Sequence, residues 1–395
     1  MNVYADNAAT TKMSETAIRA MLASMREDCG NPSSLYTLGQ QAKESLERAR
    51  EEIAAAIHAD PREITFTSGG SEADNQALRS AAALGRKDGK THIISTAFEH
   101  HAILHTLKAL EREGFEVTLL PVHEDGLVRP AELEAAIRED TCLVSVMYAN
   151  NEIGTIQPIR ELGAICKAHG VLFHTDAVQA VAHLPVDVQA ENVDLLSASA
   201  HKFHGPRGVG FLYARRGVKL TNLIEGGAQE RGKRAGTENV AGIVSMAAAL
   251  REAVANLEKN AAHLIPLRDR LIAGLKTIPH SALNGDAEKR LPGNVNFCFE
   301  GIEGESLLLL LDDRGISASS GSAYTSGSLD PSHVLLAIGR KHDVAHGSLR
   351  LTLGEDVTQE EIDYLIRSVG EVVEYLRSFS PIWRDLVSGK KEFIL

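Results

Sequence analysis

Several residue types that specialised scaffolds depend on are scarce in this chain of 395 residues. It has four cysteines, with no Cys-x-x-Cys pair and no cysteine–histidine cluster at zinc spacing: Cys29, Cys142, Cys166 and Cys298. This scarcity excludes a disulfide-stabilised secreted domain and predicts no metal site. The last three cysteines lie in apolar or amphipathic segments, so we expect buried thiols there. We assign Cys29 no chemical role.

Positive charge and long apolar runs are scarce as well. Asp and Glu (53) outnumber Lys and Arg (41), which gives a net charge of −12. Such a surface repels nucleic acid and anionic membranes, so neither is an expected partner. No apolar run approaches the ~20 residues of a membrane-spanning helix, and residues 1–7 lack the basic and apolar regions of a signal peptide. We therefore expect a cytoplasmic protein that acts on small substrates or binds other proteins.

Helical and strand-like segments alternate from about residue 13 to 255. This order is typical of an α/β fold in which a mainly parallel sheet is sandwiched by helices. The predicted strands are short and rich in branched apolar residues, as strands covered on both faces should be. They are residues 64–66, 92–95, 116–120, 143–147, 171–174, 194–197 and 210–213.

A long Ala/Leu-rich helical stretch, residues 240–260, leads into a segment that reads as α+β, with helices at 264–275, 305–314 and 359–378 and strands at 293–297 and 349–353. We predict a large domain over residues 13–257. A smaller α+β domain would comprise residues 1–12 and 258–395 and carry a loop at 319–330.

The most informative segments are an acid at the end of an apolar strand and a lysine shortly downstream. Asp176 directly follows the strand at 171–174, and Lys202 lies in a turn rich in serine and histidine. A lysine amine can hold the aldehyde of pyridoxal 5'-phosphate (PLP) as a Schiff base, and a carboxylate can keep the pyridine nitrogen protonated. Ligands gather at the carboxyl ends of strands in open α/β sheets. Gln179, three residues after the acid, can reach the phenolic oxygen of the same cofactor.

A phosphate site is predicted nearby. Residues 67–73, Thr-Ser-Gly-Gly-Ser-Glu-Ala, connect a strand to a helix. Glycines permit close backbone approach, and the helix N-terminus presents unpaired N–H groups. Ser199 and His201, beside the lysine, can also donate to a phosphate.

Two further residues suit the chemistry of such a cofactor. His100 follows the strand at 92–95, where an imidazole can lie over a planar ring and move protons. Arg350, on an alternating strand, can clamp a substrate carboxylate with two hydrogen bonds.

Together these segments resemble the NifS/IscS-type cysteine desulfurases, a branch of the class V aminotransferases with the fold-type I PLP architecture. The resemblance covers nearly the whole chain. It runs through residues 6–11 (DNAATT), 30–34 (GNPSS), 67–73, 99–100, 150–154 (NNEIG), the segments around Asp176 and Lys202, 234–237 (RAGT) and 348–350 (SLR).

The resemblance implies a role for each matching residue. Lys202 would be the Schiff-base lysine, Asp176 the partner of the pyridinium and Gln179 the partner of the phenolate. The remaining assignments are phosphate ligands (Gly70, Ser71, Ser199 and His201), a phosphate contact to the partner subunit of a homodimer (Thr237), a stacked acid/base histidine (His100) and substrate-binding residues (Asn151 and Arg350). The implied activity takes sulfur from L-cysteine, giving L-alanine, for iron–sulfur cluster assembly or other sulfur acceptors.

One position departs from the family pattern. The family's loop carries its nucleophilic cysteine in Ser-Ser-Gly-Ser-Ala-Cys-Thr-Ser-Gly, whereas residues 319–327 here have Tyr324 at that place. A phenol with a reference pKa of ~10 is mostly protonated near neutral pH and cannot hold a persulfide. We therefore predict that PLP and L-cysteine are bound but that persulfide transfer is impaired.

Two other functions remain compatible with the sequence. A PLP lyase or aminotransferase, acting on selenocysteine or cysteine sulfinate, needs no loop thiol. A non-catalytic scaffold that binds sulfur acceptors through its acidic surface needs no cofactor chemistry, although the intact set of cofactor residues speaks against it.

Overall fold

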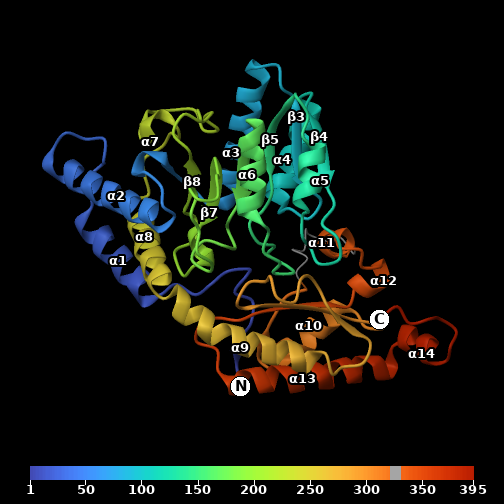
Figure 1. Ribbon diagram of the computed structural model, residues 1–395. Helices are drawn as coiled ribbons and strands as arrows, with labels where there is room; N and C mark the ends of the chain where they lie inside the picture. The colour runs from blue at the N-terminus through green and yellow to red at the C-terminus, as the bar shows by residue number, and fades with distance from the viewer. Residues whose placement is uncertain (321–330) are drawn as a thin grey trace.

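A computed structural model describes residues 1–320 and 331–395, and its largest element is a seven-stranded sheet (Figure 1). The strand order is β2-β8-β7-β6-β5-β3-β4. All neighbours from β7 to β4 are parallel, while β8 is antiparallel to both β7 and β2. The prediction of a mainly parallel sheet is therefore confirmed. The strands are β2 (Ile64–Thr67), β3 (His92–Thr96), β4 (Glu116–Leu120), β5 (Thr141–Ser145), β6 (Leu172–Asp176), β7 (Leu195–Ser199) and β8 (Gly210–Ala214).

The central strands are buried along their whole length, as their branched apolar residues predict. The expected strand at 143–147 begins two residues earlier than predicted. The residues just after it still bond to β6, because Val146 N–H donates to the His174 carbonyl and Tyr148 N–H to the Asp176 carbonyl. Backbone pairing beyond β5 thus holds the end of β6 in place.

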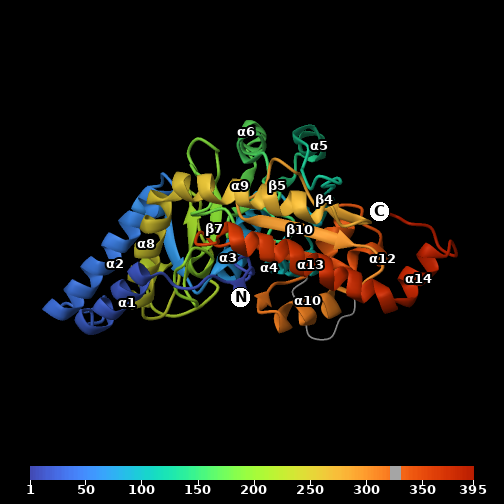
Figure 2. The same ribbon diagram turned by 90° about the horizontal axis from the view of Figure 1, so that it is seen from below.

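Helices cover both faces of this sheet. Figure 2 shows α5 and α6 on one face and α3 and α4 on the other, and α1, α2 and α8 pack together at one side. Helix α3 begins within the glycine-rich turn at 67–73, where the sequence predicts the start of a helix. The helices are α1 (Glu15–Glu27), α2 (Thr37–Ala56), α3 (Gly70–Lys87), α4 (His101–Arg112), α5 (Pro130–Ala136), α6 (Ile159–His169), α7 (Gln229–Gly232) and α8 (Val240–Ala255), with 3₁₀ turns at Pro61–Glu63 and Ala200–Lys202.

A second hydrophobic cluster surrounds a three-stranded antiparallel sheet of order β12-β10-β9, and it includes Val3 and Ala5 from the N-terminus. The domain boundaries that we expect around it stay a prediction. The strands are β9 (Ser281–Leu283), β10 (Asn294–Phe299) and β12 (Ser348–Thr352), and β1 (Val3–Tyr4) pairs with β11 (Ile316–Ser317). The helices are α9 (Leu257–Leu275), α10 (Gly304–Asp313), α11 (His333–Ala337), α12 (His342–Ala345), α13 (Gln359–Phe379) and α14 (Pro381–Val387).

The prediction of one continuous helix over 240–260 is wrong. The chain breaks at Asn256, and α9 starts at Leu257 and continues through Pro266. Asn256 has φ −104° and ψ 4°, and its side-chain amide donates to the Glu252 carbonyl, so it closes α8 and lets the chain turn. The two helices meet at 66°.

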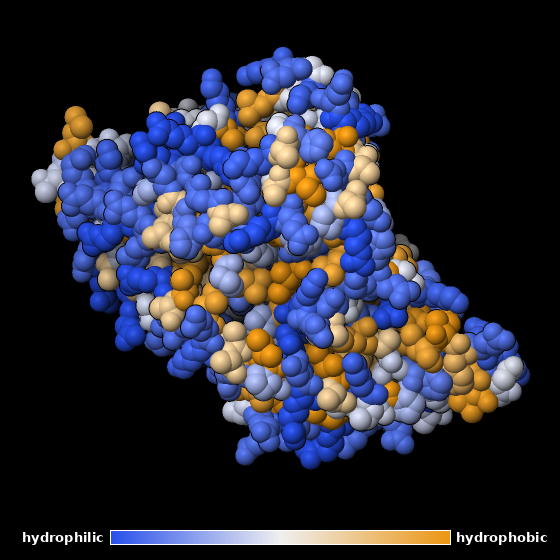
Figure 3. Space-filling model, in the orientation of Figure 1, coloured by the Kyte–Doolittle hydropathy of each residue, from blue (hydrophilic) through white to orange (hydrophobic). Residues whose placement is uncertain are grey.

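No single helix within residues 1–320 and 331–395 has the length and apolar character needed to cross a membrane; only the bent pair α8–α9 meets both criteria when taken together. The view in Figure 3 is mostly hydrophilic. Apolar side chains gather at its lower right, over the C-terminal helices, where Phe379, Ile382 and Val387 are exposed.

The cysteine expectations can be checked in the described residues. Cys142, Cys166 and Cys298 are buried and Cys29 is exposed. Burial raises the pKa of the Cys142 and Cys298 thiols to about 11. The prediction of buried thiols at these three positions is confirmed.

Candidate active site

A pocket of about 970 Å³ lies where the carboxyl ends of the parallel strands face β12 and α11. Most of the residues singled out from the sequence line it: Gly70, Ser71, His100, Asn151, Asp176, Gln179, Ser199, His201, Lys202 and Arg350. Thr237 does not line it, and Tyr324 lies outside the described residues. The fold therefore brings side chains separated by up to 280 positions into one cavity.

Lys202 ends the 3₁₀ turn that follows β7, and its ammonium group points at the N-terminal segment. Its Nζ donates to the Ala8 carbonyl at 2.6 Å and to the Ala9 carbonyl at 2.8 Å. Burial and, to a lesser extent, the Arg350 guanidinium lower the pKa of Lys202 to about 8, while Asp176 and Asp6 oppose both effects. A substantial fraction of this amine is thus neutral, which nucleophilic addition to a carbonyl requires.

Asp176 is the last residue of β6, and its side chain enters the same pocket. The carboxylate accepts a hydrogen bond from Val178 N–H at 3.0 Å. Burial raises the pKa of Asp176, while His100, the Val178 amide and Lys202 act in the opposite direction. A buried carboxylate of this kind is better placed to accept a hydrogen bond from a protonated ring nitrogen than to be hydrated.

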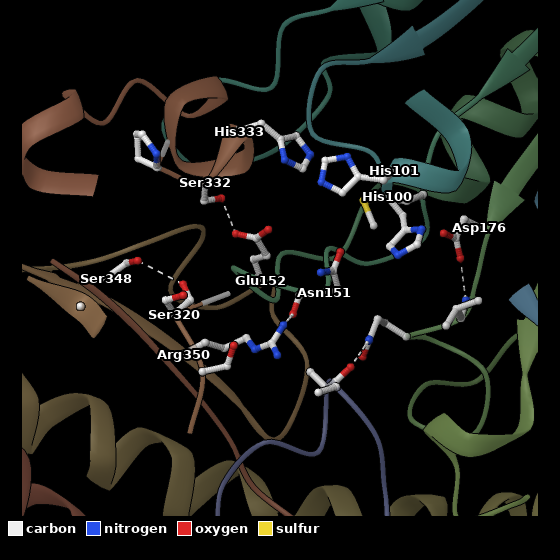
Figure 4. A pocket seen from close by; sticks show the side chains of 18 of the residues that line it. His100, His101, Asn151, Glu152, Asp176, Ser320, Ser332, His333, Ser348 and Arg350 are labelled. Carbon is white, nitrogen blue, oxygen red and sulfur yellow. Dashed lines mark hydrogen bonds between the residues drawn. The ribbon is translucent and has the colours of Figure 1, made fainter. Parts of the chain in front are cut away.

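His100 caps the N-terminus of α4. Its Nδ1 accepts a hydrogen bond from Ala102 N–H at 3.1 Å, which leaves the proton on Nε2. Figure 4 shows the imidazole between Asp176 and Asn151, with the ring inside the pocket. The cap therefore determines which nitrogen of the ring carries the proton.

The predicted phosphate turn lies beside Lys202. Gly69 has φ +152°, and α3 begins at Gly70, where an added Cβ would lie 2.7 Å from a Val178 methyl group. Glycine at both positions lets the backbone approach the strand ends closely. The first N–H groups of α3 and the Ser199 and His201 side chains are thereby placed along the same wall.

Arg350 lies on β12 and is only 4% exposed. Its guanidinium donates to an Asp6 carboxylate oxygen at 2.8 Å and to the Asn151 carbonyl at 3.0 Å, and within the described residues its Nε has no partner. Figure 4 shows it reaching from β12 toward Asn151. The residue assigned to the substrate carboxylate is thus already held by an internal acid.

Two buried acids, one in the pocket wall and one outside it, were given no role in the sequence analysis. Glu152 lines the pocket, and Ser332 Oγ donates to its carboxylate. Burial raises the pKa of Glu152 to about 7, and Ser332 and Arg350 oppose this shift. Glu99 accepts from Thr96 Oγ1 and Met147 N–H, and burial raises its pKa to about 8. The NNEIG segment at 150–154 contained the first acid, but nothing in the pattern showed that it would be buried.

Comparisons with known proteins agree with this geometry. The profile of the family "Aminotransferase class-V" matches residues 3–365. The cysteine desulfurase IscS of Clostridium botulinum is 53% identical over 393 residues, which is 99% of each chain. The chain belongs to the IscS/NifS-type cysteine desulfurases.

Other relatives place this desulfurase chain in the same way. The cysteine desulfurase IscS of Methanosarcina thermophila is 54% identical over 96% of this chain and 94% of its own. A solved structure titled "NIFS-LIKE PROTEIN" superposes with a TM-score of 0.89 at 40% identity, covering 95% of this chain and all of that one. The desulfurase family and its fold were thus both predicted correctly, and enzymes of this family depend on PLP.

The pocket of this desulfurase fits PLP. A lysine, a buried acid and a glycine-lined helix N-terminus approach the cavity from different elements, as an aldehyde, a ring nitrogen and a phosphate would require. Thr237 lies outside the pocket, in a segment tied to α3 by the Arg234–Glu72 ion pair at 2.9 Å. Its assigned contact with the phosphate of a partner subunit stays a prediction.

Proposed function

We propose that this protein binds PLP at Lys202 and uses it to act on L-cysteine. The observation that carries the proposal is the convergence of Lys202, Asp176 and the N-terminus of α3 on one pocket. In this assignment Gln179 bonds to the phenolic oxygen, and Gly70, Ser71, Ser199 and His201 hold the phosphate. The names of the relatives support cysteine as the substrate.

The cofactor, when bound, supplies an aldehyde and an electron-withdrawing ring that stabilises negative charge at the substrate carbon. The chain's own residues supply the rest. Asp176 holds the proton of the ring nitrogen, and Lys202 Nζ offers a partly neutral amine that can also carry a proton within the pocket. His100 presents its Nε2 proton to the same space.

The substrate carboxylate would be bound by Arg350, with Asn151 beside it. Arg350 Nε is buried and has no partner in the described part of the chain, so one donor already awaits an acceptor. A bidentate bond would also draw the guanidinium away from Asp6, because the carboxylate of the substrate competes for the same N–H groups. Arg350 thus exchanges one carboxylate for another when cysteine binds.

Tyr324 takes the place of the family's nucleophile, and we propose that it impairs transfer of sulfur to the protein. At about pH 7.5 a phenol of pKa ~10 is roughly 0.3% ionised, whereas a thiol of pKa ~8.5 is about 10% ionised. The ionised fractions differ by about 30-fold, and phenolate oxygen is in addition a poorer nucleophile toward sulfur than a thiolate is. Delivery of sulfur to an acceptor or iron–sulfur scaffold protein would be reduced accordingly.

The experiment compares the unaltered protein with Tyr324→Cys, with Tyr324→Phe as the matched control. Alanine and sulfide formed from L-cysteine are measured after bound PLP has been quantified by its absorbance. We expect Tyr324→Cys to be about 30-fold faster or more, and Tyr324→Phe to match the unaltered protein. Equal rates for tyrosine and cysteine would refute the assignment of the loop.

Tyr324 also favours a second function, that of a PLP lyase which needs no loop thiol. A selenium or sulfinate group leaves without nucleophilic help, so selenocysteine or cysteine sulfinate would be the substrate. Brisk turnover of either with none of L-cysteine would decide for the lyase. The non-catalytic scaffold would be favoured instead by two results together. The purified protein would be colourless, and treatment with PLP and borohydride would leave Lys202 unmodified.

We also propose a homodimer, because Thr237 lies outside the pocket of its own chain. The test is sedimentation equilibrium of the unaltered protein together with the PLP affinity of Thr237→Ala. A monomer with full PLP affinity would contradict this part of the proposal.

A further inference from the structure

One aspartate in the pocket wall has no role in the sequence analysis or in the proposed mechanism. Asp74, in the second turn of α3, lines the pocket and is only 1% exposed. Within the described residues, its Oδ1 has no hydrogen-bond partner. An ionised carboxylate in such a position would be very costly, because it has lost water and gained no donor for that oxygen.

The groups that face Asp74 make the charged form still less favourable. Asp176 on β6 and Glu99 after β3 are buried acids whose charge would repel it, and the hydroxyl of Ser197 on β7 opposes them only in part, because burial and Asp176 act on Asp74 more strongly. His174, also on β6, places Nε2 3.7 Å from Asp74 Oδ1. No cation therefore compensates a charge on Asp74, whereas Asp176 has the Val178 amide, His100 and Lys202.

His174 is itself held as a neutral ring. Its Nε2 is 3.0 Å from Ser197 Oγ and its Nδ1 is 2.9 Å from Ser145 Oγ, so both nitrogens are occupied by hydroxyl groups. The side chain is fully buried, and burial lowers the pKa of His174 to about 3. A neutral imidazole cannot pair with an ionised Asp74, so the contact at 3.7 Å is not an ion pair.

We propose that Asp74 is a permanently protonated positioning residue that leaves Asp176 as the only anion facing the ring nitrogen. Two acids packed together in a dry site do not both ionise, and the one with compensating donors and cations becomes the anion. The part that concerns the ring nitrogen rests on the proposed PLP function; the protonation of Asp74 itself does not.

The decisive test uses the protein without PLP. Because the unfolded chain ionises Asp74 above about pH 4 while the folded chain keeps it protonated, this residue makes folding less favourable as pH rises. Asp74→Asn keeps the shape and cannot ionise. We expect its Tm, relative to the unaltered protein, to rise steadily between about pH 5 and pH 8.

The matched control is Asp88→Asn, at the exposed C-terminal end of the same helix. Its Tm difference from the unaltered protein should stay constant over the same range. A difference for Asp74→Asn that is flat, or that falls as pH rises, would overturn the proposal. An ionised Asp74 paired with a protonated His174 would bind the same number of protons and also give a rising difference, so the infrared measurement, which detects the protonated carboxylic acid itself, separates that pair from the proposal.

A second measurement remains informative even if Asp74→Asn does not fold. Infrared spectra of the unaltered apo protein with ¹³C-labelled aspartate should contain the band of a protonated carboxylic acid at neutral pH. Its absence would refute the assignment of the proton. In the PLP-loaded protein, Asp176→Asn should change the pH dependence of the cofactor absorbance, and Asp74→Asn should leave it unchanged. If the measurements without PLP show a protonated Asp74 but the absorbance does not respond in this way, the proposed PLP site is wrong and the protonation of Asp74 stands.

Discussion

The lysine of the pocket leads to a prediction whose magnitude follows from the structure. Burial and the Arg350 guanidinium lower the pKa of Lys202 to about 8. At about pH 7.5 roughly a quarter of this amine is neutral, whereas an ordinary lysine with a pKa of ~10.4 is neutral in about one molecule per thousand. Lys202 should therefore react with electrophiles about two hundred times faster than its unshifted counterpart would.

The assay is trace labelling of the apo protein with acetic anhydride across a range of pH, followed by mass spectrometry of the peptide that contains Lys202. The reagent is uncharged, so its access does not depend on the phosphate site. We expect half-maximal reactivity near pH 8. An exposed lysine such as Lys87 provides the internal comparison in each sample.

The perturbation is Arg350→Met. Removing the guanidinium takes away a repulsive charge and releases Asp6, whose carboxylate then attracts the ammonium group more strongly. Both changes raise the pKa of Lys202, so the midpoint should move to higher pH and the reactivity at pH 7.5 should fall. Arg216→Met, at an exposed position, serves as the control. A midpoint near pH 10 in the unaltered protein, or one that Arg350→Met leaves in place, would contradict the assigned effects of burial and of Arg350 on Lys202.

Two further predictions concern stability. Glu230 accepts two hydrogen bonds of 2.8 Å from Arg50, and both side chains are 3% exposed, so Glu230→Ala should lower the free energy of unfolding by ~3–5 kcal/mol in urea titrations. Glu47 also pairs with Arg50 but is exposed, so Glu47→Ala should lower the free energy of unfolding by under about 1 kcal/mol. Similar losses of stability for the two variants would contradict the argument. The pair His204–Glu355, 2.8 Å apart, raises the pKa of His204 and lowers that of Glu355 to about 2. The stabilisation by this pair is complete between about pH 4.5 and 6.5, and it is lost as pH rises through the folded pKa of His204 or falls toward 2. Glu355→Gln should therefore lower the free energy of unfolding by ~1–3 kcal/mol in that window and by less at pH 9. An equal loss at pH 9 would rule out a stabilising ion pair.

Much of the candidate site could be predicted because its chemistry is local in the chain. Asp176 had to lie at a strand end because an apolar run stops there, and Lys202 follows the next strand in a tight turn. Parallel neighbours place the ends of both strands at one edge of the sheet. The phosphate turn at Gly69 and Gly70 was readable for the same reason, since strand, glycines and helix follow one another directly.

Helix boundaries were less predictable, and the physical reason is the strength of the local signal. The stretch 240–260 is helical by composition throughout, and only one asparagine marks the break. Asn256 ends α8 because its side chain bonds back to the Glu252 carbonyl while α9 turns away at 66° to cover the second sheet. The packing of α9 against α13 and β10, and not its composition, selects that turn.

The family, the mainly parallel sheet and the residue types of the cofactor site could be predicted from the sequence alone, because these depend on short runs and their spacing. Folding brings Arg350 to Asp6, places Lys202 against the Ala8 and Ala9 carbonyls, and buries Asp74 beside Asp176. These contacts join residues that lie far apart in the chain. Their charge states follow from burial and from the neighbours that folding assembles, and no local pattern encodes either.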